Sequence, residues 1–135
     1  MSGTKKLLVS DVVLDSSAVL AFLKGEPGGD LVSRSLQSAA ISTINLCEVV
    51  SKLSEGGMRE SAVNDTIDNL GLNVIPFDEE QAYQTGLLRN STRAHGISMG
   101  DRACLSLAKM LGVPALTADK SWAELSVGAK IRVIR

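Results

Sequence analysis

Apolar residues in this chain occur in short runs that alternate with longer amphipathic stretches. Val12-Val13-Leu14 and Ala115-Leu116-Thr117 have the length and composition of buried strands. Elsewhere apolar residues recur every three positions, as at Cys47, Val50 and Leu53, which is the spacing of one face of a helix. Strands that alternate with helices predict a mainly parallel sheet covered on both faces.

Residues that break regular structure separate the predicted elements. Gly25-Glu26-Pro27-Gly28, Gly56-Gly57 and Gly112-Val113-Pro114 each end a helical stretch. Strands are expected at about residues 11–15, 40–42, 73–76, 115–117 and 131–134. Helices are expected at about residues 16–24, 30–38, 43–54, 59–70, 79–89 and 101–111, with 96–100 as a loop.

Length and composition indicate one globular domain. The chain has 135 residues, 44% of them hydrophobic and 21% charged, which suits a single folded unit with a buried core. In residues 1–10, Lys5 and Lys6 precede only three apolar residues, too few for a signal peptide. We therefore expect a cytoplasmic protein with an N-terminal extension at 1–10 and a folded domain at 11–135.

The cysteines, the histidine and the net charge limit the kinds of catalytic and binding site that this chain can form. Cys47 and Cys104 each lie in an apolar helical stretch and are expected to be reduced core residues. A single histidine, His95, excludes metal sites built from several histidines and catalysis by a histidine pair. The net charge of −1 gives no overall basic surface for nucleic acid, so a polyanion would have to be bound by local basic residues and by metal.

Four acidic residues occupy positions that a parallel sheet would gather at one edge. Asp15 ends the first apolar run, and Asp119 lies two residues after Ala115-Leu116-Thr117. Asp101 is expected in the first turn of the preceding helix, and Glu48 inside a helix entered from the same edge. Ligands of open parallel sheets bind beyond the carboxyl ends of the strands. Clustered carboxylates without basic partners normally imply a bound cation, so the pattern predicts a hard-metal site.

Further polar residues lie close to these four in the sequence. Ser16 and Thr117 flank the predicted site and could hold carboxylates or water in orientation. Asn45 lies three positions before the glutamate, so its amide could share a polar edge with that carboxylate. Arg102 and Lys120 are candidates for phosphate contacts, although each could equally be a solvated surface charge.

Three longer stretches surround the acidic residues. The first is Asp15-Ser16-Ser17-Ala18-Val19-Leu20-Ala21 followed by Gly25-Glu26-Pro27-Gly28, and the second runs from Ile41-Ser42 to Glu48. The third is Gly96-Ile97-Ser98-Met99-Gly100-Asp101-Arg102-Ala103-Cys104-Leu105, which continues as Leu116-Thr117-Ala118-Asp119-Lys120-Ser121-Trp122. In this order and spacing the stretches resemble PIN-domain ribonucleases of the VapC toxin type, over about residues 11–135.

The resemblance implies a fold, an activity and partners. The fold would be a three-layer α/β/α sandwich around a mainly parallel sheet of about five strands. The protein would be a homodimeric, metal-dependent endoribonuclease, inhibited by a VapB-like antitoxin that inserts a segment across the site. Mg²⁺ or Mn²⁺ would be held by Asp15, Glu48, Asp101 and Asp119. Mg²⁺ suits such a site because it prefers oxygen ligands and keeps several waters, and a metal-activated water could attack the phosphorus.

Three other functions are compatible with parts of the pattern. A non-catalytic PIN-like module would only bind RNA or protein, but all four carboxylates are present. A phosphohydrolase with Asp15 as nucleophile would be expected to have a second aspartate two positions later, where this chain has Ser17. A receiver-type phosphoacceptor would use a lysine such as Lys120, but its aspartate would follow a middle strand instead of the first.

Overall fold

Five parallel strands form one sheet, in the order β3-β2-β1-β4-β5. The structure is a computed structural model that describes residues 10–135, so the predicted N-terminal extension lies outside the described residues except for Ser10. The mainly parallel five-stranded sheet expected from the sequence is confirmed. The strands are β1 (Val12–Leu14), β2 (Ala39–Ser42), β3 (Asn73–Ile75), β4 (Ala115–Thr117) and β5 (Ile131–Val133).

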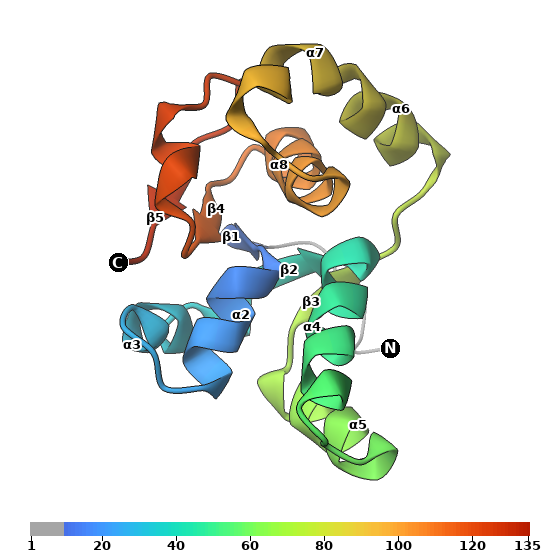
Figure 1. The fold of residues 1–135 in the computed structure, drawn as a ribbon, viewed down its shortest axis with the longest axis vertical. Coiled ribbons are helices and arrows are strands. Elements are labelled where there is room, and N and C mark those ends of the chain that lie inside the picture. The colour runs from blue at the N-terminus through green and yellow to red at the C-terminus, as the bar shows by residue number, and fades with distance from the viewer. Residues whose placement is uncertain (1–9) are drawn as a thin grey trace.

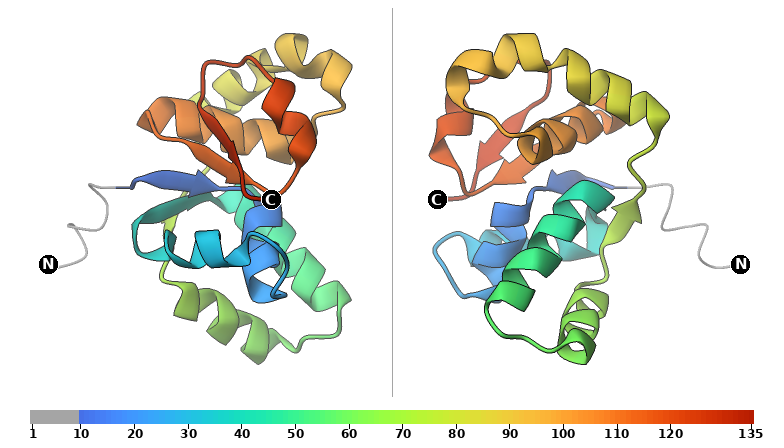
Figure 2. Two further views of the ribbon diagram at one scale, coloured as in Figure 1. Left: turned by 90° about the vertical axis from the view of Figure 1, so that its left-hand side faces the viewer. Right: turned by 45° about the vertical axis from the view of Figure 1, so that its right-hand side comes forward.

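Helices cover both faces of the sheet, which confirms the three-layer arrangement (Figures 1 and 2). One layer contains α2 (Ser16–Leu23), α3 (Gly29–Ser33), α4 (Thr43–Glu55) and α5 (Glu60–Leu70). The other contains α6 (Glu79–Leu87), α7 (Arg89–Thr92) and α8 (Met99–Leu111). Short 3-10 turns are η1 (Leu36–Ser38), η2 (Arg93–His95) and η3 (Lys120–Glu124). Among residues 10–135, no helix has the length and apolar character needed to cross a membrane.

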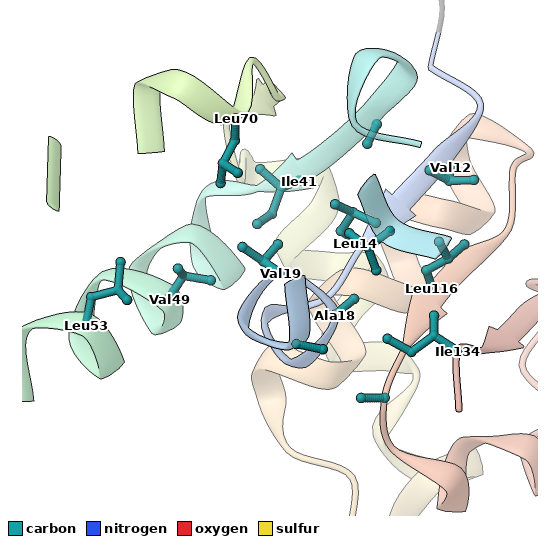
Figure 3. Packing of buried hydrophobic residues seen from close by; sticks show 14 of the residues in the cluster. Val12, Leu14, Ala18, Val19, Ile41, Val49, Leu53, Leu70, Leu116 and Ile134 are labelled. Atoms are coloured by element: carbon teal, nitrogen blue, oxygen red, sulfur yellow. The ribbon is translucent and has the colours of Figure 1, made fainter. Parts of the chain in front are cut away.

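Two hydrophobic cores lie on opposite faces of the sheet. Leu14 and Ile41 pack with Val19 of α2 in the first core (Figure 3). Val13 points to the other face and packs with Leu105 of α8. Neighbouring residues of a strand face opposite sides, so a sheet covered by helices on both faces needs apolar residues at every position. This requirement explains why β1 is a continuous apolar run.

Three helix boundaries differ from those expected. The helix predicted at 30–38 is divided into α3 and η1, and the one predicted at 79–89 ends at Leu87. The last long helix begins at Met99 because Ser98 caps it. The Ser98 hydroxyl accepts from the backbone N–H of Asp101, and the Asp101 carboxylate accepts from the backbone N–H of Ser98. The end of the predicted loop 96–100 is therefore helical.

The buried face of α4 also differs from the expected one. Its buried residues are Asn45, Val49 and Leu53, which repeat every four positions. Cys47 lies about half a helical turn from Asn45 and is exposed, so its assignment to the core was wrong, whereas Cys104 is buried as expected. The buried side of α4 differs from the prediction because it includes a polar side chain, Asn45, which a pattern of apolar residues does not reveal.

Candidate metal centre

Two of the four acidic residues lie where adjacent strands β1 and β4 end. Asp15 follows β1 and caps α2, where its carboxylate accepts from the Ala18 N–H at 2.8 Å. Asp119 follows β4 and caps η3. The chain runs from β1 outward through β2 to β3 and then returns to β4 beside β1. This is the switch point at which open parallel sheets bind ligands.

Hydroxyl groups connect Asp15 to the end of β4. Thr117 Oγ1 donates to Asp15 Oδ2 at 2.6 Å and accepts from the backbone N–H of Asp119 at 3.0 Å. Ser17 Oγ donates to Asp15 Oδ1 at 2.8 Å and accepts from the Ala118 N–H at 2.9 Å. These bonds hold the Asp15 carboxylate in one orientation and fix the backbone that leads to Asp119.

The other two acidic residues meet through α4 and α8. Asn45 Nδ2 donates both to Glu48 Oε1 and to the Gly100 carbonyl, each at 3.0 Å. The expected pairing of Asn45 with Glu48 is therefore confirmed. A Cβ at position 100 would overlap the Glu48 carboxylate, so this carboxylate lies directly against Gly100, next to Asp101. The two helices can approach this closely because residue 100 has no side chain.

The acidic residues affect one another electrostatically. Burial, with a smaller contribution from the charge of Asp101, raises the pKa of Asp15 to about 6, although its hydrogen bonds lower the pKa. Burial also raises the pKa of Asp101, with additional contributions from Glu48 and Asp119. In residues 10–135 none of these four carboxylates forms an ion pair with a basic side chain. Asp101 is thus electrostatically linked to each of the other three carboxylates, and none of the four has a basic partner in the described residues.

The donor set fits a hydrated divalent cation. Asp15 is 3% exposed, so its charged form loses the favourable contact with water that a free carboxylate has. A bound cation would offset that loss. As placed in residues 10–135, no three acidic, cysteine or histidine side chains are close enough to hold one ion together. Mg²⁺ binds through one or two carboxylates and keeps several waters, so it does not require a closed set of protein ligands.

We expect the stability of the metal-free protein to decrease as the pH rises from about 4 to about 6, because of Asp15. The pKa of Asp15 rises from 3.8 to about 6 on folding. The free energy that Asp15 contributes to stability is therefore fully present below pH 3.8 and is lost as the pH rises through about 6. A shift of this size corresponds to about 3 kcal/mol. Urea unfolding with EDTA across this range should show a pH dependence that Asp15→Asn lacks; equal slopes for the two proteins would contradict it.

Two residues of the site were not identified as site residues from the sequence. Ser17, and not the neighbouring Ser16, holds Asp15; its sequence signal is its position two residues after a helix-capping aspartate. Gly100 makes room for Glu48, but only the contact between helices reveals this. Thr117 is in contact with Asp15 as expected, and Lys120 is exposed beside Asp119, where a phosphate contact stays a prediction.

Arg102 is not placed to contact a phosphate. Its side chain is buried between α8 and α6, where Nη1 donates to the Thr85 carbonyl at 3.1 Å. The reason is its helical position: Asp101 faces the acidic site, and the next residue lies about 100° further around the helix. Arg102 therefore joins two helices of the same layer.

Comparison with known proteins supports the likeness to PIN domains. A family model described as PIN domain matches residues 12–128. No curated protein matches the sequence. The crystal structure of VapBC2 from Rickettsia felis bound to a promoter DNA fragment is similar over 92% of this chain and 98% of that chain, with 19% identity and a TM-score of 0.71.

Two further solved structures share the fold. DNA-bound VapBC from Salmonella typhimurium is 16% identical over 94% of this chain and all of that chain, with a TM-score of 0.73. VapC20 from Mycobacterium tuberculosis, described as a toxin that cleaves the sarcin-ricin loop, is 18% identical over 88% of this chain and 99% of that chain, with a TM-score of 0.67.

Proposed function

The chain belongs to the PIN domain family, and on that premise we propose that it is a divalent-metal-dependent endoribonuclease that hydrolyses phosphodiester bonds in RNA. One observation supports the proposal: buried Asp15 has no basic partner in residues 10–135, and the charge of Asp101 raises its pKa. A bound cation is the simplest source of the missing positive charge.

The proposed metal-binding residues are Asp15, Glu48, Asp101 and Asp119, with one or two carboxylates bound to the ion directly and the others through its waters. Mg²⁺ or Mn²⁺ is the proposed ion because all four donors are oxygen. Such an ion supplies a more acidic water and offsets negative charge on the scissile phosphate. The protein orients the ligands.

Three side chains carry out that orientation. Ser17 and Thr117 donate to both oxygens of Asp15, and Asn45 donates to Glu48. Ligand carboxylates that are held by hydrogen bonds present their free lone pairs in a constant direction.

We further propose that the protein is the toxin of a VapBC-type pair, acts in the cytoplasm and forms a homodimer. The similarity of its fold to structures of VapBC complexes supports this. The residues before β1, 1–10, would be an extension of the nuclease domain at 11–135. The proposal expects a small gene for a DNA-binding, VapB-like antitoxin immediately upstream; a gene with neither such a neighbour nor such a binding partner would argue against it.

RNA cleavage should require Mg²⁺ or Mn²⁺ and stop when EDTA is in excess, and the products should carry 5′-phosphate and 3′-hydroxyl ends. The chain has one histidine, and His95 has no second histidine to share acid–base work on the ribose 2′-hydroxyl. End-labelling of the fragments, with Asp101→Asn purified in parallel as the control for contaminating nuclease, tests both. Undiminished cleavage in chelator, or 2′,3′-cyclic phosphate ends, would overturn the mechanism.

A further inference from the structure

Residues 81–100 contain no aspartate or glutamate, although the chain has 15 acidic residues in all. The same stretch contains Arg89 and Arg93. In a chain of net charge −1 this is a local excess of positive charge. The stretch contains Ser98, the cap of α8, and ends directly before Asp101 in the chain.

Residues on either side of the segment 89–97 form hydrogen bonds with the first turn of α8. At one end the Thr85 carbonyl accepts from Arg102, and Arg89 lies four residues further, about one helical turn or 6 Å along the chain. At the other end Ser98 and Asp101 form the capping box. Figure 1 shows this segment, in gold, arching from the end of α6 to the beginning of α8. Arg93 lies five residues before Ser98, so the segment with both arginines leads into the first turn of α8, which contains Asp101.

The arginine side chains are on the outer face of this arch. Thr92 is buried and its hydroxyl donates to the Leu88 carbonyl at 2.8 Å, which fixes the inner face. Arg89 and Arg93 are exposed and four residues apart in helical backbone, so they share one side. In residues 10–135 neither forms an ion pair. Unpaired surface arginines can make bidentate contacts to phosphate.

We propose that Arg89 and Arg93 bind backbone phosphates of the RNA strand on one side of the cleavage point. The inference rests on the proposed function, because a polyanion has to approach four carboxylates that repel it. Cations close to that site lower the repulsion, and contacts to phosphates position a strand without reading its sequence. Arg89 and Arg93 would therefore contribute to binding of any single-stranded RNA.

The test compares two double variants of equal charge change. Arg89→Gln/Arg93→Gln removes the proposed contacts, and Arg34→Gln/Arg59→Gln removes two exposed arginines next to α3 and α5, in the opposite helical layer. Both are made in an Asp119→Asn protein to prevent cleavage. Fluorescence anisotropy measures the affinity for a labelled single-stranded RNA of random sequence over a series of NaCl concentrations.

Two lost phosphate contacts should lower the slope of log affinity against log salt by about 1.4, at about 0.7 for each contact. The control variant should keep the slope of its parent, and Arg89→Lys/Arg93→Lys should also keep it because the charges remain. An unchanged slope in the glutamine variant, or an equal fall in the control, would overturn the inference. Failure of wild-type protein to cleave RNA in Mg²⁺ or Mn²⁺ would overturn the proposed function instead, while the anisotropy result would still decide whether these arginines contact phosphate.

Discussion

Asp101→Asn is expected to lower RNA cleavage about 100-fold or more, the scale seen when one electrostatic contact to the reacting group is removed. The same substitution should make the metal-free protein more stable by about 0.5 to 2 kcal/mol. Burial and the charges of Glu48 and Asp119 raise the pKa of Asp101, so its ionised form is less favourable in the metal-free folded protein than in water. Asparagine removes the charge and can still accept from the Ser98 N–H.

Asp78→Asn is the matched control. Asp78 also caps a helix, accepting from the Gln81 N–H at 3.0 Å, but it lies outside the proposed site, and both it and its acidic neighbours Glu79 and Glu80 are exposed. Asparagine caps about as well as aspartate, so this variant should keep both stability and cleavage. The measurements are urea unfolding with EDTA and a fluorogenic RNA assay. Full activity in Asp101→Asn would refute the site assignment, and unchanged stability would refute the proposed charge repulsion.

Gly100→Ala should reduce cleavage about 10- to 100-fold, the range for substitutions that disturb the orientation of a metal ligand. The added methyl group would overlap the Glu48 carboxylate, which either leaves its bond to Asn45 or pushes α8 away from α4. Overpacking of this kind costs about 1 to 3 kcal/mol of stability.

Gly86→Ala provides the opposite case in a neighbouring helix. Gly86 lies inside α6 and is exposed, and a Cβ there would contact nothing within 4 Å. Alanine should therefore stabilise the protein by about 0.5 to 1 kcal/mol and leave cleavage unchanged.

Measured in a Glu48→Ala background, the stability cost of Gly100→Ala should largely disappear, since the two groups no longer overlap. A cost that persists there would show that the contact with Glu48 is not its cause.

Much of the architecture can be derived from local sequence. The apolar run at β1 and the regular spacing of apolar residues in α8 predict their elements because strand and helix periodicities act over a few neighbouring residues. Positions just after a strand, such as Asp15, can be assigned to one edge because all strands of a parallel sheet point the same way. The PIN resemblance, carried by motifs around the acidic residues, agrees with the matched family model.

Local sequence was less informative about which side of a helix is buried. The spacing of Cys47, Val50 and Leu53, widened by Val49, suggested one face for α4. Val49 and Leu53 are buried, but Cys47 and Val50 are exposed and the inner face contains Asn45 instead. An amide can be buried there because the Gly100 carbonyl, 55 residues away in the chain, accepts its hydrogen bond. No pattern within α4 contains that partner.

The details of the site depend on contacts between distant segments. Whether Ser16 or Ser17 holds Asp15 is decided by Thr117 at the end of β4 and by Ala118, which follows it. Ser17 contacts both of these residues, which lie about 100 residues later in the chain. Arg102 is directed into the contact with Thr85 by the packing of α6 on α8. The sequence by itself determined the class of fold, the family and the acidic positions, because these depend on local periodicity and motif spacing. The tertiary structure alone decided which neighbours orient each carboxylate, because hydrogen bonds and close packing between α2, α4, α8 and β4 exist only once the chain has folded.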